Sequence, residues 1–371
     1  TVELQCHGSP AMLAAGLEAL LAAGARQAGP GEFTRRAFLN GKLDLTQAEA
    51  VVDLIDAETA DAAANAAGQL GGALKRAIGP VYDGLTDLCS HFHAVLDYPD
   101  EDIEDFGAAE LSGALDRAGA ALQELLATYE KGRHLRQGVR AVLLGKPNAG
   151  KSSLLNRLAG YDRVIVTDIA GTTRDTVEEP VRVGRVLLRL TDTAGIREAG
   201  DAIEALGVAR SEQAAREAEL ALFVCDASQP LTDEDRRAIE AAKCAPRSLA
   251  LCNKSDLPAA VSPDELPFDT VLTVSARTGA GLDALPALLE GWFLGGNACD
   301  GSLLTNPRQF GALDRASRAI ERAKTGLCLG VTPDAVLTDV EEAMAALGEV
   351  TGRTVREDIT NRIFERFCVG K

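Results

Sequence analysis

The chain has 371 residues, 46% of them hydrophobic, and its 38 basic and 55 acidic residues give a formal net charge of −17. This length supplies material for two or three domains that fold without disulfide staples. The acidic balance excludes a broad, non-specific grip on nucleic-acid phosphates, because that mode of binding needs a basic surface that releases counterions. Any nucleic-acid contact is expected to be local or supplied by a partner.

The eight cysteines are scattered, with no C-x-x-C pair and no His/Cys cluster at zinc spacing. A reducing compartment fits this pattern best, and we expect a cytoplasmic protein. No run approaches 18 uninterrupted apolar residues, so we expect no membrane-spanning segment. The chain begins at Thr1, in a stretch at 1–5 that we interpret as the middle of a strand, and we expect the natural protein to begin earlier.

Alanine- and leucine-rich stretches predict helices at 12–23, 46–77, 78–96 and 108–132. After Gln137, short apolar runs alternate with helical stretches, as in a doubly wound α/β sheet. These runs predict strands at 140–144, 187–191, 220–225, 249–252 and 271–274. Residues 181–189, centred on Gly184, predict a hairpin. Helical texture returns at 313–326, 333–348 and 357–367, so the plan is helices, an α/β domain and helices again.

Residues 145–152 read Gly-Lys-Pro-Asn-Ala-Gly-Lys-Ser and satisfy the pattern G-x-x-x-x-G-K-[ST]. The pattern lies between an apolar strand and a helix at 152–158, which favours a phosphate cradle over an ordinary glycine turn. Glycines let backbone amides surround phosphate oxygens at the positive end of a helix, and Lys151 brings a cation to the outer phosphates. Ser152 is expected to ligate magnesium.

A guanine-reading motif is predicted at 253–256, Asn-Lys-Ser-Asp, directly after the strand at 249–252. Asp256 can accept hydrogen bonds from the guanine N1 and N2 positions, whereas adenine would leave this buried carboxylate unpaired. GTP is therefore preferred over ATP. Residues 275–277, Ser-Ala-Arg, follow the next strand and are expected to supply a backbone amide for the guanine carbonyl.

Two switch segments complete the set. Residues 192–195, Asp-Thr-Ala-Gly, follow a strand and place Asp192 near magnesium and Gly195 near the terminal phosphate. Thr173, in the Gly-Thr-Thr-Arg-Asp segment at 171–175, is expected to complete the magnesium shell. The nucleotide is expected to contact Asn148, Ala149, Gly150, Lys151, Ser152, Ser153, Thr167, Asp168, Ile169, Ala170, Gly171, Thr172, Thr173, Asp192, Thr193, Ala194, Gly195, Asn253, Lys254, Asp256, Ser275, Ala276 and Arg277.

Four elements in this order predict a GTP-hydrolysing enzyme of the Ras-like P-loop class, with a mixed, mostly parallel sheet inserted into an all-α domain. Ile196 stands where Ras-like enzymes carry a water-orienting glutamine, and isoleucine cannot orient water. A monovalent cation held by Asn148 and the first switch, or Glu204 acting through a bridging water, could take over that work. From the residues alone, Glu204 is more simply a solvated helix carboxylate.

The residues also resemble a known family, the MnmE or TrmE tRNA-modifying GTPases of bacteria and organelles. The resemblance covers essentially the whole chain. Beside the GTPase motifs it is carried by Pro30 to Thr34 (PGEFT), Arg36 to Leu45 (RAFLNGKLDL) and Phe367 to Lys371 (FCVGK). These flanking segments are far more specific than the phosphate loop.

The resemblance implies a remnant of an amino-terminal α+β folate-binding domain at 1–40, a helical domain formed by 41–137 and 298–371, and a GTPase domain at 138–297. It also implies a homodimer that works with a flavoprotein, MnmG, as a heterotetramer. Together they would install an aminomethyl or carboxymethylaminomethyl group on carbon 5 of the wobble uridine of tRNA. 5-Formyltetrahydrofolate or methylenetetrahydrofolate would supply the carbon, and tRNA would be held mainly by the complex.

Site residues follow from the resemblance position by position. Potassium, which stimulates hydrolysis by promoting contact between GTPase domains, is expected at Asn148, Thr167, Ile169 and Thr172. Glu204 matches the catalytic glutamate. Glu3, Lys42 and Lys371 match folate-contacting positions. Cys368 matches a tail cysteine proposed to act in the modification chemistry, and the alternative for it is a partly buried small hydrophobe.

Two other functions remain open. One is a ribosome-assembly GTPase of the Era or Der kind, although such enzymes usually carry a basic RNA-binding domain that this acidic chain lacks. The other is a GTP-gated scaffold in which no residue of this chain touches the substrate. Full uridine modification by a Cys368→Ser variant would favour the scaffold.

Overall fold

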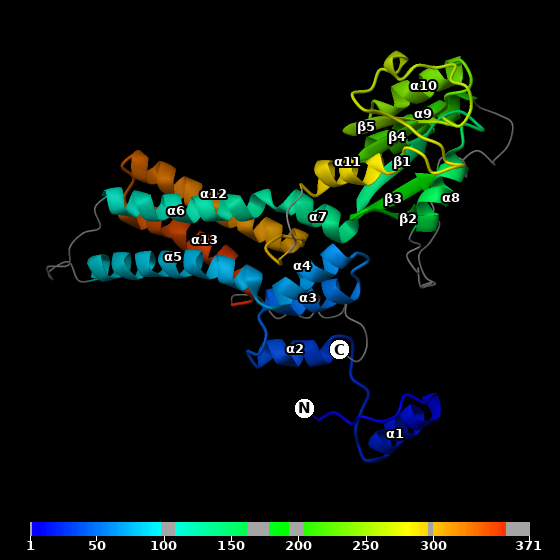
Figure 1. Ribbon diagram of the computed structural model, residues 1–371. Coiled ribbons are helices and arrows are strands. Elements are labelled where there is room, and N and C mark those ends of the chain that lie inside the picture. Colours follow the sequence, from blue (N-terminus) through cyan, green and yellow to red (C-terminus); the bar gives the residue numbers. More distant parts are fainter. Residues whose placement is uncertain (1, 98–107, 162–177, 193–203, 296–299, 354–371) are drawn as a thin grey trace. The chain divides into compact units, whose positions relative to one another are not determined.

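The computed structural model describes residues 2–97, 108–161, 178–192, 204–295 and 300–353. The chain divides into two compact units, each coloured along the sequence in Figure 1. One unit comprises residues 1–52, 69–118 and 315–371. The other comprises residues 53–68 and 119–314, and it contains the whole sheet.

In the first unit, α5 (Ala73–Asp97) and α13 (Pro333–Thr351) pack against each other. Buried apolar residues recur every three or four positions on both, which places them on one face of each helix. They are Leu74, Ile78, Val81, Leu85 and Leu88 on α5, and Val336, Val340, Ala343, Leu347 and Val350 on α13. The two helices therefore pack face to face, and Cys89 Sγ of α5 lies 3.4 Å from Met344 Sδ of α13.

The remaining helices outside the α/β region are α1 (Pro10–Ala22), α2 (Glu32–Leu39), α3 (Leu45–Ile55), α4 (Ala60–Leu70), α6 (Ala108–Ala127), α7 (Tyr129–Gln137) and α12 (Pro307–Cys328). The predicted strand at 1–5 is wrong, since residues 2–5 carry no strand and Val2 and Leu4 are exposed. A strand requires a hydrogen-bonded neighbour, and no described strand pairs with this segment.

The predicted helix at 46–77 is wrong as a single element, because the chain forms α3, α4 and the start of α5 there. Thr59 Oγ1 accepts a hydrogen bond from the Ala62 amide at 3.1 Å and so caps the start of α4. Gly72 takes a left-handed φ of 82° between α4 and α5. The first break is thus marked by a capping side chain and the second by a glycine with a positive φ. Neither signal stands out in an alanine-rich stretch.

The predicted helix at 108–132 is also divided, into α6 and α7, with Thr128 between them. The Thr128 hydroxyl donates to Leu125 O at 2.7 Å and accepts from the Leu304 amide at 3.0 Å. Gly132 lies so close to this returning segment that a Cβ atom would meet Leu304 O at 2.2 Å. The contact between α7 and residues 304–305 thus fixes the position of the break.

The second unit contains a six-stranded sheet in the order β2-β3-β1-β4-β5-β6. Its strands are β1 (Val139–Leu144), β2 (Glu178–Val183), β3 (Val186–Asp192), β4 (Leu220–Asp226), β5 (Arg247–Asn253) and β6 (Val271–Thr273). β2 and β3 form the predicted antiparallel hairpin, and all other neighbours are parallel. The predicted strands and the mixed, mostly parallel sheet are confirmed.

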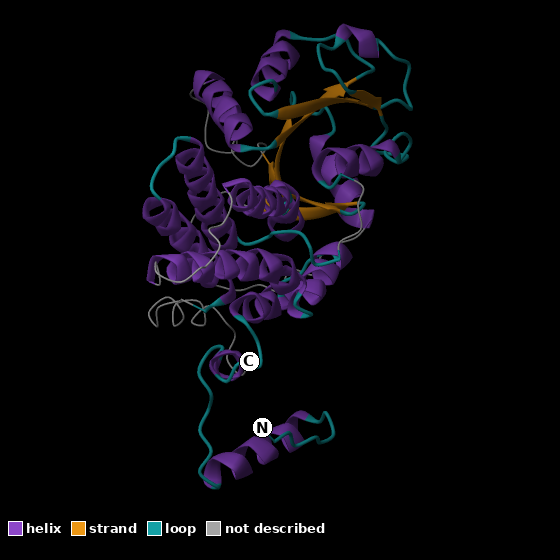
Figure 2. Cartoon of the chain, turned by 90° about the vertical axis from the view of Figure 1, so that its left-hand side faces the viewer, coloured by secondary structure: helices purple, strands orange, loops and turns teal. Residues whose placement is uncertain are grey.

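Helices cover both faces of this sheet, as the purple ribbons beside the orange strands show (Figure 2). They are α8 (Lys151–Tyr161), α9 (Glu204–Glu217), α10 (Asp233–Ala242) and α11 (Ala284–Phe293), with a short 3-10 turn at Pro263–Glu265. Along β4, Leu222 and Val224 pack with residues of α8 and α11, whereas Phe223 packs with residues of α10. Burial on both faces explains the unbroken apolar runs that marked these strands.

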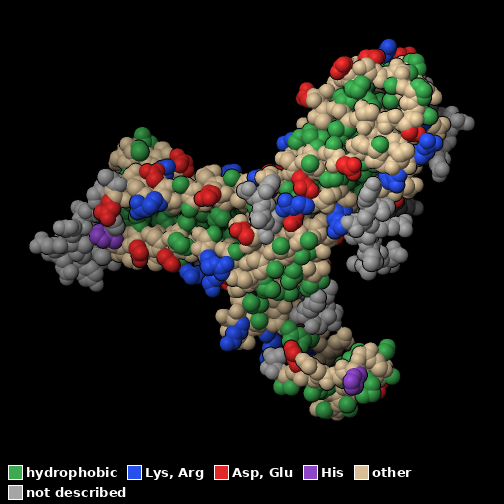
Figure 3. All heavy atoms as spheres, viewed as in Figure 1, with side chains coloured by type: hydrophobic (Ala, Val, Ile, Leu, Met, Phe, Trp, Pro, Cys, Tyr) green, Lys and Arg blue, Asp and Glu red, His purple; other side chains and the backbone are tan. Residues whose placement is uncertain are grey.

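No helix in the described ranges is long and apolar enough to cross a membrane. On the face drawn in Figure 3, acidic and basic side chains are interspersed rather than gathered by sign. The six cysteines outside the undescribed segments are free thiols.

Glu219 ties three elements of the second unit together in the short link between α9 and β4. Its carboxylate accepts hydrogen bonds from Arg133 Nη2, from His134 Nε2 at 3.1 Å, and from the Arg140 amide at 3.1 Å. Burial alone would raise the pKa of this carboxyl group, but the hydrogen bonds from His134, Arg133 and Arg140 outweigh it and lower the pKa to about 2.

A Glu219→Gln variant tests this anchor. Because the folded-state pKa is depressed, the carboxylate stabilises the fold fully above its unfolded pKa near 4.5 and loses that effect as the pH falls towards about 2. We expect the free energy of unfolding of the variant to be about 2 kcal/mol lower at pH 7. In urea unfolding, this deficit should shrink between pH 5 and pH 3, and a deficit that stays constant would contradict the assignment.

Candidate nucleotide-binding site

The predicted motifs meet at one edge of the sheet. β1, β3, β4 and β5 run parallel, so their carboxyl ends lie at the same edge. The strand register pairs Leu143 with Asp192 and Asp226 with Asn253. The loops that continue from these strands therefore start side by side.

The loop after β1 has positive φ angles and close backbone contacts that favour glycine and asparagine. Gly145 and Gly150 have φ angles of 145° and 98°. A Cβ atom would meet Val224 O at 2.1 Å if placed on Gly145, and Asn253 Nδ2 at 2.2 Å if placed on Gly150. Asn148 lies in the left-handed region with a φ of 61°. The loop thus packs directly on β4 and β5, and α8 begins at its end.

Lys151, the first residue of α8, folds its side chain back over this loop. Its Nζ atom donates to Gly145 O at 2.8 Å and to Lys146 O at 2.9 Å. The ammonium group is therefore held against the loop that leads into α8, and the positive end of this helix also favours an anion. Phosphate oxygens carry more charge than these carbonyls and are stronger acceptors for the same group.

Lys146 fixes the other side of the loop through a buried ion pair. Its Nζ atom lies 2.9 Å from Asp235 Oδ2, and the two side chains are 11% and 0% exposed. Asp235 also accepts from the amide and hydroxyl of Thr232, the residue that caps α10. The phosphate loop is thereby tied to the amino terminus of α10.

Asn253 joins the phosphate loop to the base-reading segments. Its buried side chain donates from Nδ2 to Ala149 O at 2.9 Å and accepts at Oδ1 from the Ala276 amide at 2.9 Å. The next residue, Lys254, has a φ of 65° and directs its Nζ atom to Asp226 Oδ2 at 2.7 Å. One amide side chain thus sets the spacing between the phosphate end and the base end of the site.

Asp256 presents a carboxylate beside the turn after β6. Oδ1 accepts from Ser275 Oγ at 2.6 Å, and Oδ2 lies 3.1 Å from Arg277 Nη2. The hydrogen bond from Ser275, which outweighs desolvation, keeps the pKa of Asp256 below its ordinary value. The group therefore stays ionised and acceptor-only near neutral pH, which suits the paired N–H donors of guanine.

A cleft of about 470 Å³ opens beside the phosphate loop. Two predicted contact residues, Asn148 and Lys254, line it together with residues that were not among the predicted nucleotide contacts. The latter are Lys146, Pro147, Asp226, Gln229, Thr232, Asp233, Glu234 and Arg237. Of these, Asp226 is the last residue of the fully buried strand β4, at the carboxyl edge, a position that could have marked it from the sequence.

Only some of the other predicted residues lie within the described ranges. Ser152 and Ser153 are exposed on the first turn of α8, Asp192 ends β3, and Glu204 begins α9. The following predicted residues lie outside the described ranges: Thr167, Asp168, Ile169, Ala170, Gly171, Thr172, Thr173, Thr193, Ala194, Gly195, Cys368 and Lys371. The described part of the site thus holds the phosphate loop and the base reader.

The predicted folate residues fall in the first unit. Lys42 lines a cavity of about 270 Å³ with Lys75, Arg353, Tyr82 and Phe38 among its walls. The Arg353 guanidinium lies 4.5 Å from the centre of the Tyr82 ring. Glu3 is exposed and does not line this cavity.

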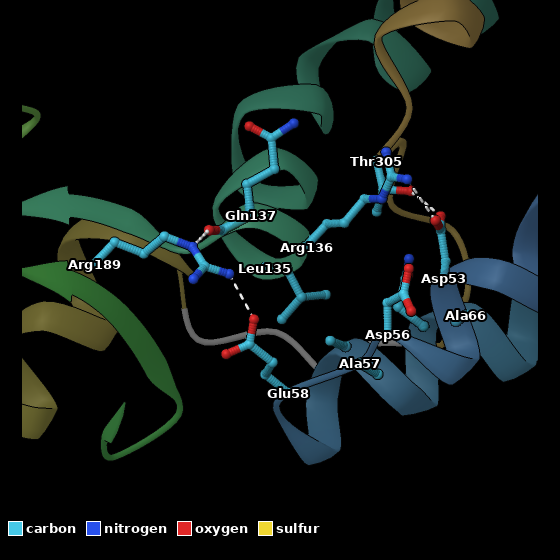
Figure 4. A pocket seen from close by; sticks show the side chains of 12 residues that line it. Asp53, Asp56, Ala57, Glu58, Ala66, Leu135, Arg136, Gln137, Arg189 and Thr305 are labelled. Carbon is cyan, nitrogen blue, oxygen red and sulfur yellow. Dashed lines mark hydrogen bonds and ion pairs between the residues drawn. The ribbon is translucent and has the colours of Figure 1, made fainter. Parts of the chain in front are cut away.

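Another cavity of the second unit, about 380 Å³, lies between the α3–α4 turn, α7 and β3 (Figure 4). Arg189 of β3 points towards two of its walls, donating to Gln137 O at 2.7 Å and to Glu58 Oε1 at 2.5 Å. Arg136 pairs with Asp53 at 2.8 Å on the other side. β3, the strand that ends at Asp192, is therefore bonded to α7 and to the α3–α4 turn.

Comparison with protein-family models matches residues 45–368 to the MnmE helical domain and residues 1–42 to the amino terminus of the GTP-binding protein TrmE. Curated relatives bear the name tRNA modification GTPase MnmE. The protein of Roseiflexus sp. (strain RS-1) is 46% identical over 387 residues, covering 100% of this chain and 82% of the relative. That of Enterococcus faecalis is 41% identical over 377 residues, covering 100% and 81%.

Among solved structures, the G domain of the T. maritima FeoB iron transporter matches 40% of this chain and 94% of its own, with 22% identity and a TM-score of 0.30. Elongation factor SelB from Methanococcus maripaludis matches 41% of this chain and 33% of its own, with 19% identity and a TM-score of 0.30.

The Lys146–Asp235 pair can be tested by a double-mutant cycle. Lys146→Met leaves a buried carboxylate without its cation and should lower the unfolding free energy by about 3 kcal/mol. Adding Asp235→Asn removes that charge, so the double variant should lose less than the sum of the two single variants. Urea unfolding measures all three.

The matched control is Lys243→Met, at the carboxyl end of α10, the helix that also contains Asp235. Lys243 pairs with Glu240 at 3.1 Å but is 40% exposed, so its loss should cost less than about 0.5 kcal/mol. Strictly additive effects of Lys146→Met and Asp235→Asn would show that the two side chains do not stabilise each other.

Proposed function

The chain belongs to the tRNA modification GTPase MnmE family and is a GTP hydrolase, and we propose that it uses GTP hydrolysis to modify the wobble uridine of tRNA. One observation carries the nucleotide half of this proposal. Asn253 bonds the phosphate loop and the turn beside Asp256 at the same time, so it would hold a triphosphate site and a guanine reader at a fixed spacing.

Magnesium would be held by Ser152 and Thr173, next to the Asp192 end of β3. Ser152 fits this role, because its exposed hydroxyl lies on the first turn of α8, directly after Lys151. Hydroxyl and carboxylate oxygens are the donors that magnesium prefers. The metal would neutralise charge on the outer phosphates, while Lys151 binds the same oxygens.

Hydrolysis would depend on Glu204 and on potassium, because Ile196 cannot orient water. Asn148, Thr167, Ile169 and Thr172 would hold the ion, and Asn148 fits because its left-handed backbone places it in the phosphate loop at the cleft. Glu204 begins α9, the helix after the second switch, and would orient the attacking water. Contact between two GTPase domains of a homodimer would complete the site.

The modification chemistry would take place with the flavoprotein MnmG, in a heterotetramer that holds most of the tRNA. A one-carbon folate would bind through Glu3, Lys42 and Lys371. The Lys42 cavity suits an anionic, aromatic ligand, because Lys75, Arg353 and Tyr82 also line it. Cys368 would act in the transfer step. The protein would work in the cytoplasm. Its domain boundaries would lie at 40/41, 137/138 and 297/298.

The proposal is tested by hydrolysis in potassium and in sodium. A carboxamide and backbone oxygens suit the larger ion, so GTP turnover should rise at least about tenfold when potassium replaces sodium. Light scattering of the same samples should report a dimer in potassium. Equal turnover in the two salts would contradict the potassium site.

Glu204→Ala serves as the paired variant in that experiment. Because Glu204 is proposed to act on water rather than on the nucleotide, the variant should bind GTP as the unchanged protein does and hydrolyse it slowly in either salt. Lost GTP binding with unchanged turnover would refute its role.

A further inference from the structure

Arg157 of α8 forms a forked contact with the turn that follows β6. Its Nε atom donates to Ala276 O at 3.2 Å, and its Nη2 atom donates to Arg277 O at 2.6 Å. Guanidinium is planar and rigid, so two bonds to consecutive carbonyls fix the orientation of both peptide planes. The helix that begins at the phosphate loop therefore also holds the turn at the base end of the site.

The orientation of these carbonyls determines where the neighbouring amides point. The peptide bonds in the described part of the chain are all trans, so the carbonyl of one residue and the amide of the next point in opposite directions. Two carbonyls facing α8 turn the amides of Arg277 and Thr278 to the other side. On that side the Thr278 amide donates to Ser275 Oγ at 3.2 Å.

The Ala276 amide belongs to the preceding peptide plane, and it donates to Asn253 Oδ1 at 2.9 Å. The Ala276 amide is therefore already used within the protein. The trans peptide turns the Arg277 amide, which lies between those of Ala276 and Thr278, away from the Ala276 carbonyl that Arg157 binds. It is the amide placed to meet the guanine carbonyl.

The same turn supports Asp256. The Ser275 hydroxyl accepts from the Thr278 amide and donates to Asp256 Oδ1 at 2.6 Å. A turn that loses its hold on α8 would therefore move both the amide for the guanine carbonyl and the partner that orients the carboxylate.

We infer that Arg157 is a positioning residue for guanine recognition, which acts by holding the Ala276 and Arg277 carbonyls so that the Arg277 amide and the Ser275–Asp256 pair face the base. Arg157 touches no part of the nucleotide itself. The inference rests on the proposed binding of guanine nucleotides at this edge of the sheet.

The test compares the unchanged chain with Arg157→Met and Arg157→Lys by calorimetry in magnesium. The ligands are GDP, ADP, and the diphosphate of 2-aminopurine riboside, which lacks the 6-carbonyl. Arg157→Met should bind GDP about tenfold more weakly, because the amide contact is no longer held in place. Its affinity for the 2-aminopurine ligand should fall by clearly less, since that ligand has no 6-carbonyl to meet the amide and can reach Asp256 only through its 2-amino group.

Arg157→Lys keeps one donor in place of the fork, so its affinity for GDP should lie between those of the unchanged protein and Arg157→Met. In steady-state hydrolysis, KM for GTP should rise about tenfold in Arg157→Met while kcat at saturation stays the same. The matched control is Arg216→Met, which removes an exposed i,i+4 pair with Glu212 and should change neither affinity.

A merely structural Arg157 gives a different result. GDP affinity equal to that of the unchanged protein with a lowered Tm, or an equal loss for GDP and the 2-aminopurine ligand, overturns the inference alone. If the unchanged protein itself binds ADP as tightly as GDP, the proposed function fails, and this inference fails with it.

Discussion

The site depends on one buried amide, the side chain of Asn253. It bonds both the phosphate loop, at Ala149, and the base-side turn, at Ala276. Both contacts are short, and the side chain is 2% exposed, so the distance between the two ends of a bound nucleotide is set before any ligand arrives. Such preorganisation lowers the entropy that binding must overcome.

Each end of this bridge is held in turn by a longer-range contact. Lys146 pairs with Asp235 of α10 at the phosphate end, and Arg157 of α8 holds the turn at the base end. β3 adds a third connection, because it ends at Asp192 and is bonded through Arg189 to Glu58 and to Gln137 O. The strand leading to the second switch is thus joined to the helical segments of the same unit.

The local features could be predicted from the sequence, and the contacts between distant residues could not. Strands buried on both faces give continuous apolar runs, and the loop at 145–152 needs glycine where the backbone approaches β4 and β5, so both leave a local pattern. Nothing local indicates that Lys146 meets Asp235, 89 residues away, or that Arg157 meets Ala276, 119 residues away. The helix break at Thr128 was missed for the same reason, since it depends on the returning segment at Leu304.

The central claim is that Asp256, held by this network, selects guanine, and calorimetry of purine diphosphates in magnesium tests it most directly. The unchanged chain should bind GDP at least about 100-fold more tightly than ADP. Asp256→Asn should prefer xanthosine diphosphate, whose 2-oxo group accepts the hydrogen bond that the new amide donates. Equal binding of ADP and GDP by the unchanged chain, or an Asp256→Asn variant that still prefers GDP, would contradict the account.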